Sequence, residues 1–127
     1  MNTSKPKSPF NKFYLTNIDG CSRLTNLKSS ESKVFNIMLD NLQSDNYCKL
    51  SAQGITDKCG VSQPTVSRAI NGLEAQCLIY RINRTIIVDP NYCWRGDVAS
   101  HYKAMQAHSE HVPYYSDVMS RLGYLPF

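Results

Sequence analysis

A helix-turn-helix pattern over residues 51–76 restricts the fold of this chain more than any other feature of its sequence. Ser51 favours the start of a helix over residues 52–59, because a serine side chain accepts a hydrogen bond from the first backbone N–H groups. Gly60 permits the left-handed backbone that ends a helix. Ser62 favours the start of a second helix. Two helices joined by so short a turn predict a helix-turn-helix.

The second helix of this motif has one apolar and one polar face. Val66, Ile70 and Leu73 recur at spacings of four and three residues, which places them on one buried face. The opposite face is small and polar with a single arginine, as entry into the major groove of DNA requires. A merely solvated face would be richer in lysine and glutamate. The candidate DNA contacts of this helix are Ser62, Gln63, Pro64, Thr65, Ser67, Arg68 and Asn71.

A hairpin pattern follows the motif directly. Residues 77–82 and 85–88 are strand-like, and Asn83-Arg84 forms the tight turn between them. The motif and the hairpin together predict a winged helix, so the expected fold class is mainly α with a small β-hairpin wing. Arg81, Asn83 and Arg84 are the candidate DNA contacts of the wing, through the backbone or the minor groove. The alternative is a solvated turn.

The flanking segments predict the remaining elements. Ser29 or Ser30 favours the start of a helix with an apolar stripe over residues 34–42. We expect this stripe, the motif and the hairpin to close one core, with Ile87 inside it. Further expected elements are a strand over residues 13–18, an extended piece over 47–50 and helices over 97–109 and 114–122.

Two stretches of the chain resemble known families. Residues 55–70 resemble the helix-turn-helix of many bacterial regulators, with Thr56 where alanine is more usual. Residues 80–97 resemble the winged helix of RepL-type plasmid replication proteins, in which the wing runs into a Pro-Asn, aromatic and basic-Gly sequence, here residues 90–96. The resemblance covers roughly residues 30–97. It implies plasmid or phage replication through binding of origin DNA without nicking.

Positive charge is concentrated in two parts of this chain of 127 residues with a formal net charge of +4. Residues 1–30 carry five lysines and arginines against Asp19, and residues 60–96 carry four arginines against two acidic residues. Basic segments favour association with polyanions such as DNA. We expect three regions, namely a flexible basic arm over 1–12, the winged helix over 13–96 and a helical extension over 97–127.

No pattern typical of a catalytic or metal site occurs. The five cysteines include no C-x-x-C pair, which argues against a zinc ribbon and a disulfide framework. His101, His108 and His111 have no cysteine or carboxylate at a metal-ligand spacing. Tyr114-Tyr115 lacks the histidine pair of a nicking site. We expect no enzyme activity, no cofactor and no metal.

The last expectations concern partners and function. The C-terminal segment carries Tyr102, Met105 and the many apolar side chains of residues 112–127, which predicts a homodimer through this segment. Removal of residues 112–127 is expected to leave a monomer, and the alternative is packing on the chain's own first helix. The sequence has no signal-peptide core and no membrane-length apolar run, so we expect a cytoplasmic protein. The expected partner is double-stranded DNA, bound sequence-specifically by a replication initiator. The alternatives are a transcriptional regulator and a winged-helix module for protein contacts.

Overall fold

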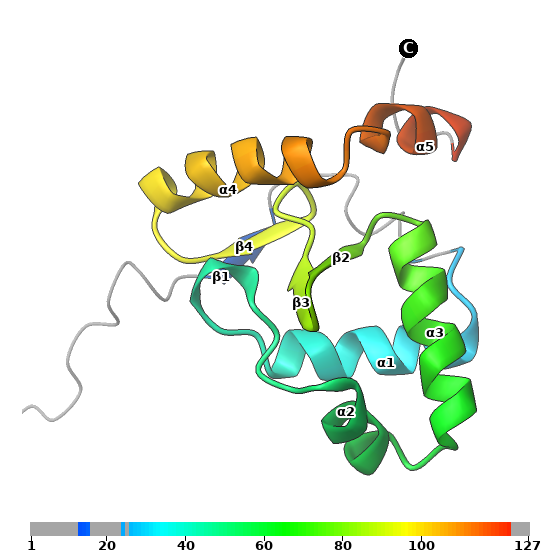
Figure 1. The fold of residues 1–127 in the computed structure, drawn as a ribbon. Coiled ribbons are helices and arrows are strands. Elements are labelled where there is room, and N and C mark those ends of the chain that lie inside the picture. The colour runs from blue at the N-terminus through cyan, green and yellow to red at the C-terminus, as the bar shows by residue number, and fades with distance from the viewer. Residues whose placement is uncertain (1–12, 16–23, 25, 123–127) are drawn as a thin grey trace, which may run out of the picture.

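The computed structural model of the chain describes residues 13–15, 24 and 26–122. This part of the chain is mainly helical and contains a small antiparallel hairpin, which confirms the expected fold class (Figure 1). The elements in chain order are β1 (Phe13–Leu15), α1 (Ser29–Asp40), the 3-10 helix η3 (Ser44–Asn46), α2 (Ala52–Cys59), α3 (Gln63–Ala75), β2 (Ile79–Ile82), β3 (Thr85–Val88), β4 (Cys93–Arg95), α4 (Val98–His111) and α5 (Tyr115–Arg121).

Helices α2 and α3 form the helix-turn-helix at the predicted place. The Ser51 hydroxyl accepts a hydrogen bond from the Gly54 N–H at 3.1 Å, which satisfies one N–H of the first turn of α2. Gly60 ends α2 with φ of 74°, in the left-handed region that suits glycine. Ser62 is the N-cap of α3 and accepts the Thr65 N–H. The short turn between the helices therefore has the predicted chemistry.

Helix α1 begins earlier than its serines predict. Lys28 is the N-cap, and the carboxylate of Glu31 accepts the Lys28 backbone N–H at 2.9 Å. Glu31 stands at the third position of the helix and satisfies the N–H of the N-cap residue, so the start of α1 is stabilised without Ser29 or Ser30 as the cap. Glu31 is buried although it is charged, and its carboxylate lies against Gly72 of α3. Helices α1 and α3 approach closely at this point.

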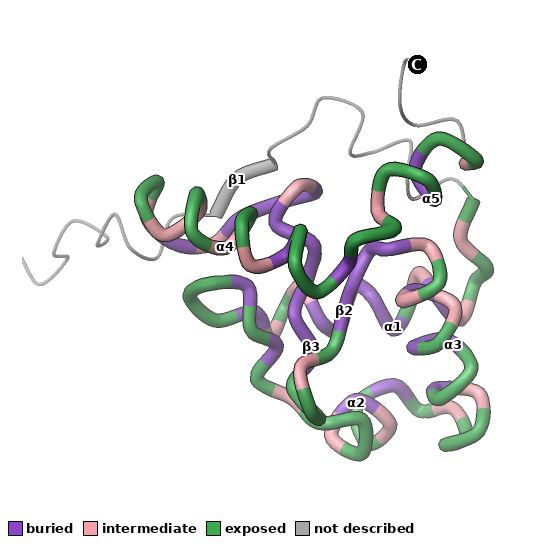
Figure 2. The backbone as a smooth tube through the Cα atoms, turned by 45° about the horizontal axis from the view of Figure 1, so that its top comes forward, coloured by how far each residue is buried: buried purple, intermediate pink, exposed green. Residues whose placement is uncertain are grey.

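Strands β2 and β3 form the predicted wing. They pair antiparallel, with Ile79 opposite Val88 and Ile82 opposite Thr85. Asn83 has φ of 59°, the left-handed conformation that a two-residue hairpin turn requires. The strands are largely buried and the tip is exposed, as Figure 2 shows. The wing therefore presents its turn to solvent while its strands belong to the body of the molecule.

The predicted start of the first wing strand at residue 77 is wrong. Cys77 has φ of 59°, and the Leu78 N–H donates to the Leu73 carbonyl at 3.0 Å. These two residues therefore end α3 and reverse the chain, and pairing begins only at Ile79. The apolar character of Cys77 and Leu78 reflects burial rather than strand structure.

A second two-stranded ladder joins β1 to β4, and β4 is not among the predicted strands. Asn46, fully buried beside it, connects η3 to the strands. Its amide nitrogen donates to the carbonyls of Val88 and Cys93 at 3.0 and 2.8 Å, and its oxygen accepts the Arg95 N–H at 2.8 Å. These bonds satisfy a buried amide and hold three segments together. Residues 16–18 of the predicted first strand lie outside the described residues.

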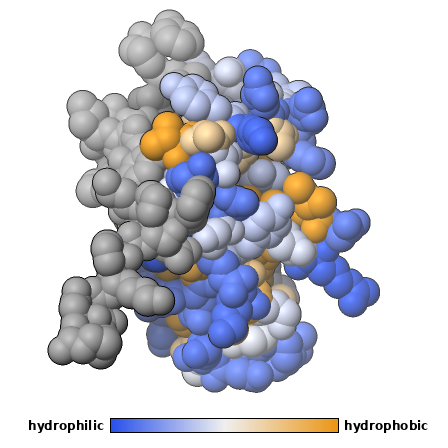
Figure 3. Space-filling view, turned by 90° about the vertical axis from the view of Figure 1, so that its left-hand side faces the viewer, coloured by the Kyte–Doolittle hydropathy of each residue, from blue (hydrophilic) through white to orange (hydrophobic). Residues whose placement is uncertain are grey.

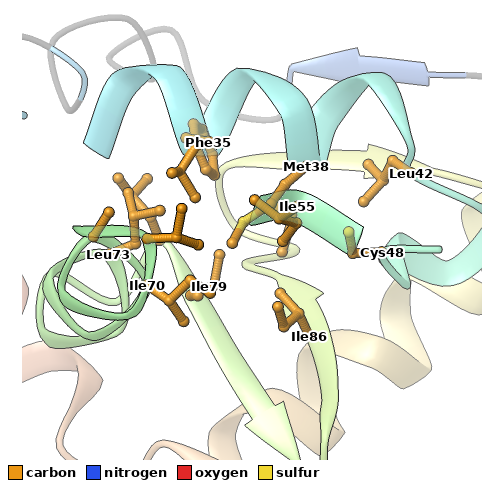
Figure 4. Packing of buried hydrophobic residues seen from close by; sticks show 14 of the residues in the cluster. Phe35, Met38, Leu42, Cys48, Ile55, Ile70, Leu73, Ile79 and Ile86 are labelled. Atoms are coloured by element: carbon orange, nitrogen blue, oxygen red, sulfur yellow. The ribbon is translucent and has the colours of Figure 1, made fainter. Parts of the chain in front are cut away.

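The main core lies between α1, α2, α3 and the inner face of the wing hairpin (Figure 4). The placement of Ile87 in this core is wrong. Side chains alternate across a strand, so Ile86 and Val88 point inward and Ile87 lies on the outer face. The labelled side chains in Figure 4 are Phe35, Met38, Leu42, Cys48, Ile55, Ile70, Leu73, Ile79 and Ile86.

A smaller second cluster is formed where the C-terminal helices cover the outer face of the hairpin. The segment from the end of α4 to α5 therefore packs on the wing strands, which corrects the alternative that it covers the first helix. Residues 123–127, which contribute to the dimer prediction, lie outside the described residues, as does the predicted arm 1–12. The buried members of the cluster are Cys77, Tyr80, Ile87, Val112, Val118 and Met119.

Within residues 13–15, 24 and 26–122, no helix combines the length and the apolar content that crossing a membrane demands. The four cysteines of this part are all buried and occupy apolar positions, as the sequence predicts for most of them. They are Cys48, Cys59, Cys77 and Cys93, whereas Cys21 lies outside the described residues.

Candidate nucleic-acid interface

The predicted contacts of α3 lie together on the outward face of the helix. The buried face of α3 packs against α1 and α2, so the N-terminal half of its polar face points away from the body, at the end of the molecule drawn lowest in Figure 1. Six of the seven predicted side chains are exposed and Thr65 is half-buried. The six are Ser62, Gln63, Pro64, Ser67, Arg68 and Asn71.

Two of these residues stabilise the start of α3. The hydroxyls of Ser62 and Thr65 lie 2.8 Å apart, and the Ser62 hydroxyl also accepts the Thr65 N–H. The Arg68 Nε–H donates to the Pro64 carbonyl at 3.3 Å, which holds the guanidinium along the first turn. This bond uses only Nε, so it is compatible with a contact through the terminal nitrogens. Arg68 is thereby oriented at the exposed N-terminal end of α3.

The wing tip places Asn83 and Arg84 in solvent beside the helix-turn-helix. Both residues belong to the exposed turn, and the two strands that flank it pair with each other. An exposed arginine on a rigid hairpin is suited to a phosphate or to a narrow minor groove.

Arg81 differs from Arg68 and Arg84 in that an ion pair with Glu74 holds its guanidinium within the chain. Its guanidinium donates to the Glu74 carboxylate at 2.6 and 3.3 Å and to the Asn71 side-chain oxygen at 3.1 Å. The hydrogen bond that Arg81 donates to the Glu74 carboxylate raises the pKa of Arg81. Arg81 therefore connects β2 to α3, and the negative charge of Glu74 offsets part of the positive charge of Arg81.

A cavity of about 320 Å³ separates the start of α2 from the wing tip. Ser51, Ala52 and Gln53 line one side, and Arg81, Asn83 and Arg84 line the other. Gln53 was not among the predicted contacts, although its position two residues after the cap of α2 was readable from the sequence. The backbone N–H groups at a helix start and the arginines across the cavity both favour an anion such as a phosphate.

A second cavity of about 190 Å³ lies between the start of α1 and α3. Lys28, Ser30 and Glu31 meet Thr65 and Arg68 there. Lys28 adds an exposed cation beside Arg68, and sequence reasoning missed it. No local signal points to Lys28, because only the packing of α1 against α3 brings the two residues together.

The three histidines of α4 pack against aromatic rings, His101 against Trp94 and both His108 and His111 against Tyr80. His101 Nε2 is 2.7 Å from the Pro90 carbonyl oxygen, and its ring stacks on Trp94. His108 is buried 3.5 Å from the Asp89 carboxylate, with its ring edge-on to Tyr80. No group of three or more histidine, cysteine or acidic side chains with the spacing of a metal site occurs in the described part of the chain.

A helix-turn-helix followed by a hairpin wing defines the winged-helix class, and this chain has that fold. The family model of the Firmicute plasmid replication protein RepL matches residues 2–112, so the chain belongs to the RepL family. No curated protein and no solved structure matches it. The chain is therefore a protein related to plasmid replication, and the family match extends the resemblance of residues 30–97 in both directions.

Proposed function

We propose that this chain initiates plasmid replication by binding double-stranded DNA sequence-specifically at the origin, without nicking it. The exposed first half of α3 is the single observation that carries the proposal. This face carries the Gln63 amide, serine hydroxyls and the Arg68 guanidinium, and it has no large apolar side chain. A helix with such a face is suited to enter a major groove. The match to the RepL family supports plasmid replication as the process in which this DNA binding takes part.

The remaining basic groups support backbone contacts on both sides of α3. Arg84 lies at the wing tip and Lys28 lies at the start of α1. A duplex seated on α3 would meet both, because the two cavities flank this helix. Backbone contacts fix the register of a protein on DNA, whereas base contacts read the sequence.

The proposal includes a homodimer that acts in the cytoplasm, where a bacterial plasmid resides. One recognition helix reads few base pairs, and two linked copies bind more tightly than either copy alone. The initiator acts by binding only, so it carries no nicking tyrosine and requires no metal.

Selection from random duplexes with the full chain tests this function. The recovered sequence is mapped onto plasmid DNA, and binding is then measured by fluorescence anisotropy at several salt concentrations. We expect a site within the replication origin, with affinity about 10³-fold or more above random DNA. Supercoiled plasmid carrying the site should stay intact when incubated with the protein and Mg²⁺.

Three results would contradict the proposal in different ways. A preferred site at a promoter, with none in the origin, would identify a transcriptional regulator of the same fold. Equal, weak binding to all duplexes would favour a module for protein contacts. A nicked product would disprove the binding-only mechanism.

A further inference from the structure

Helix α4 carries an apolar stripe that the rest of the described chain leaves exposed. Val98, Tyr102 and Met105 are spaced four and three residues apart, so they lie on one face of the helix. Val98 is 63% exposed and Tyr102 is 71% exposed. The surface at the end of the molecule where α4 begins is otherwise mostly hydrophilic, with hydrophobic residues in separate patches (Figure 3).

A recess continues this stripe toward the C-terminal end of α4. It has a volume of about 210 Å³ and is lined by Met105 and Ser109 of α4, by Val112 and Pro113 after it, and by Tyr115 of α5. An apolar cavity of about 150 Å³ is enough to hold a benzene molecule. The recess therefore has room for one aromatic ring from outside.

The stripe and the recess together form a self-complementary surface. A two-fold interface requires that one surface carry both a projecting group and the recess that receives it. If two α4 helices lie antiparallel with the axis between Met105 and Gln106, Tyr102 of each copy faces Ser109 of the other. Ser109 lines the recess, so both tyrosines reach a recess at once.

We propose that a second copy of this chain covers the stripe, with each Tyr102 inserted into the recess of the other copy. This specifies the dimer contained in the proposed function and places its central contact at α4 rather than in residues 112–127. The reason is burial: Val112, Val118 and Met119 are covered within the chain, whereas Val98 and Tyr102 are not.

Sedimentation equilibrium of the full chain tests the contact without DNA. We expect a mass of about twice 14.4 kDa at micromolar concentration. Tyr102→Ala should raise the dissociation constant of the dimer about thirtyfold or more, as loss of a central aromatic contact does. Tyr102→Phe keeps the ring and should stay dimeric. The matched control is Lys103→Ala, which removes an exposed side chain from another face of the same helix.

Tyr102 is exposed within a single copy, so a monomeric variant should still unfold cooperatively, with its melting temperature lowered only by the lost dimer linkage. A loss of dimer would therefore not be a loss of fold. A wild-type chain that is monomeric at 200 µM, or a dimer that keeps its affinity in Tyr102→Ala, would overturn the proposal. Dissociation caused instead by removal of residues 123–127 would overturn it as well. A monomer that still selects an origin site would disprove only this contact and leave the proposed function standing.

Discussion

Gln63 and Arg68 are the two long polar side chains near the N-terminal end of the α3 face, so base reading should depend on them. We expect Gln63→Ala and Arg68→Ala each to reduce discrimination between the selected site and random DNA by about 1–3 kcal/mol, the value of a bidentate base contact. Both side chains are exposed, so the melting temperature should stay unchanged. Anisotropy titrations against both duplexes provide the measurement. Lys103→Ala is the control, and equal losses on both duplexes would assign the residues to the DNA backbone.

The two arginines of the wing should respond differently to substitution. Arg84→Ala should weaken binding to all duplexes and lower the slope of log affinity against log salt by about one unit, because one phosphate contact is lost. Arg81→Ala should change this slope less, since Glu74 already pairs with Arg81. Salt titrations of the two variants on random DNA make the comparison. Equal slopes for Arg84→Ala and the wild type would show that the wing tip does not contact DNA.

Tyr80 links stability to pH at the alkaline end. Burial in the second cluster raises the pKa of Tyr80 to about 12, from the usual value near 10. Between these values the unfolded chain loses the proton while the folded chain keeps it, so the free energy of unfolding falls as pH rises from 10 to 12, by at most about 1.4 kcal/mol per pH unit. Urea unfolding across this range should show a shallower fall in Tyr80→Phe. Identical slopes would place the titration on another group.

At the scale of elements, Gly72 lets α1 and α3 touch. Alanine is a better helix former than glycine by about 1 kcal/mol, yet a Cβ at residue 72 would overlap the Glu31 carboxylate. We therefore expect Gly72→Ala to destabilise the chain by about 1–3 kcal/mol in urea unfolding. Adding Glu31→Ala should recover part of this loss. Gly54→Ala in α2 is the control and should be neutral or stabilising; the same result at residue 72 would contradict the close approach.

Helix α5 should stabilise the wing although it is remote from the DNA contacts. Met119 is 1% exposed in the cluster with Tyr80 and Ile87. Met119→Ala should cost about 2–5 kcal/mol of unfolding free energy, measured with urea, because a buried side chain leaves a cavity. Ser116→Ala on the exposed side of α5 serves as the control. A truncation before residue 112 that unfolds at the wild-type urea concentration would show that the cluster contributes nothing.

The elements that the sequence predicts well are those with local signals. Caps, Gly60 and the helical spacing lie within α2 and α3, and the wing turn lies between its own strands. Strand β4 has only three residues and gains its structure from β1 and Asn46. The hydrogen bonds of Asn46 join residues 42 to 49 positions apart, so no sequence window contains both partners. The ion pair between Arg81 and Glu74 could not be predicted, because it depends on how the wing packs against α3.

The same limit applies to the candidate site as a whole. The outward face of α3 could be predicted, because burial of one helix face determines the other. The role of Lys28 could not be predicted, because Lys28 lies beside Arg68 only through the packing of α1 against α3. The apolar residues near the C-terminus predicted a dimer or packing on the first helix. Val112, Val118 and Met119 are instead buried on the wing hairpin, and their periodicity could not identify that partner.

For the whole molecule, the position of α4 determines how a pair of copies would meet DNA. Helix α4 lies at one end of the molecule, and α2 and the start of α3 lie at the other, in both Figure 1 and Figure 2. Two copies joined through α4 would turn their recognition helices outward, toward two separate duplexes. The helical phase between two sites would then be irrelevant, and distant stretches of one plasmid, or two plasmids, would be brought together by the same dimer.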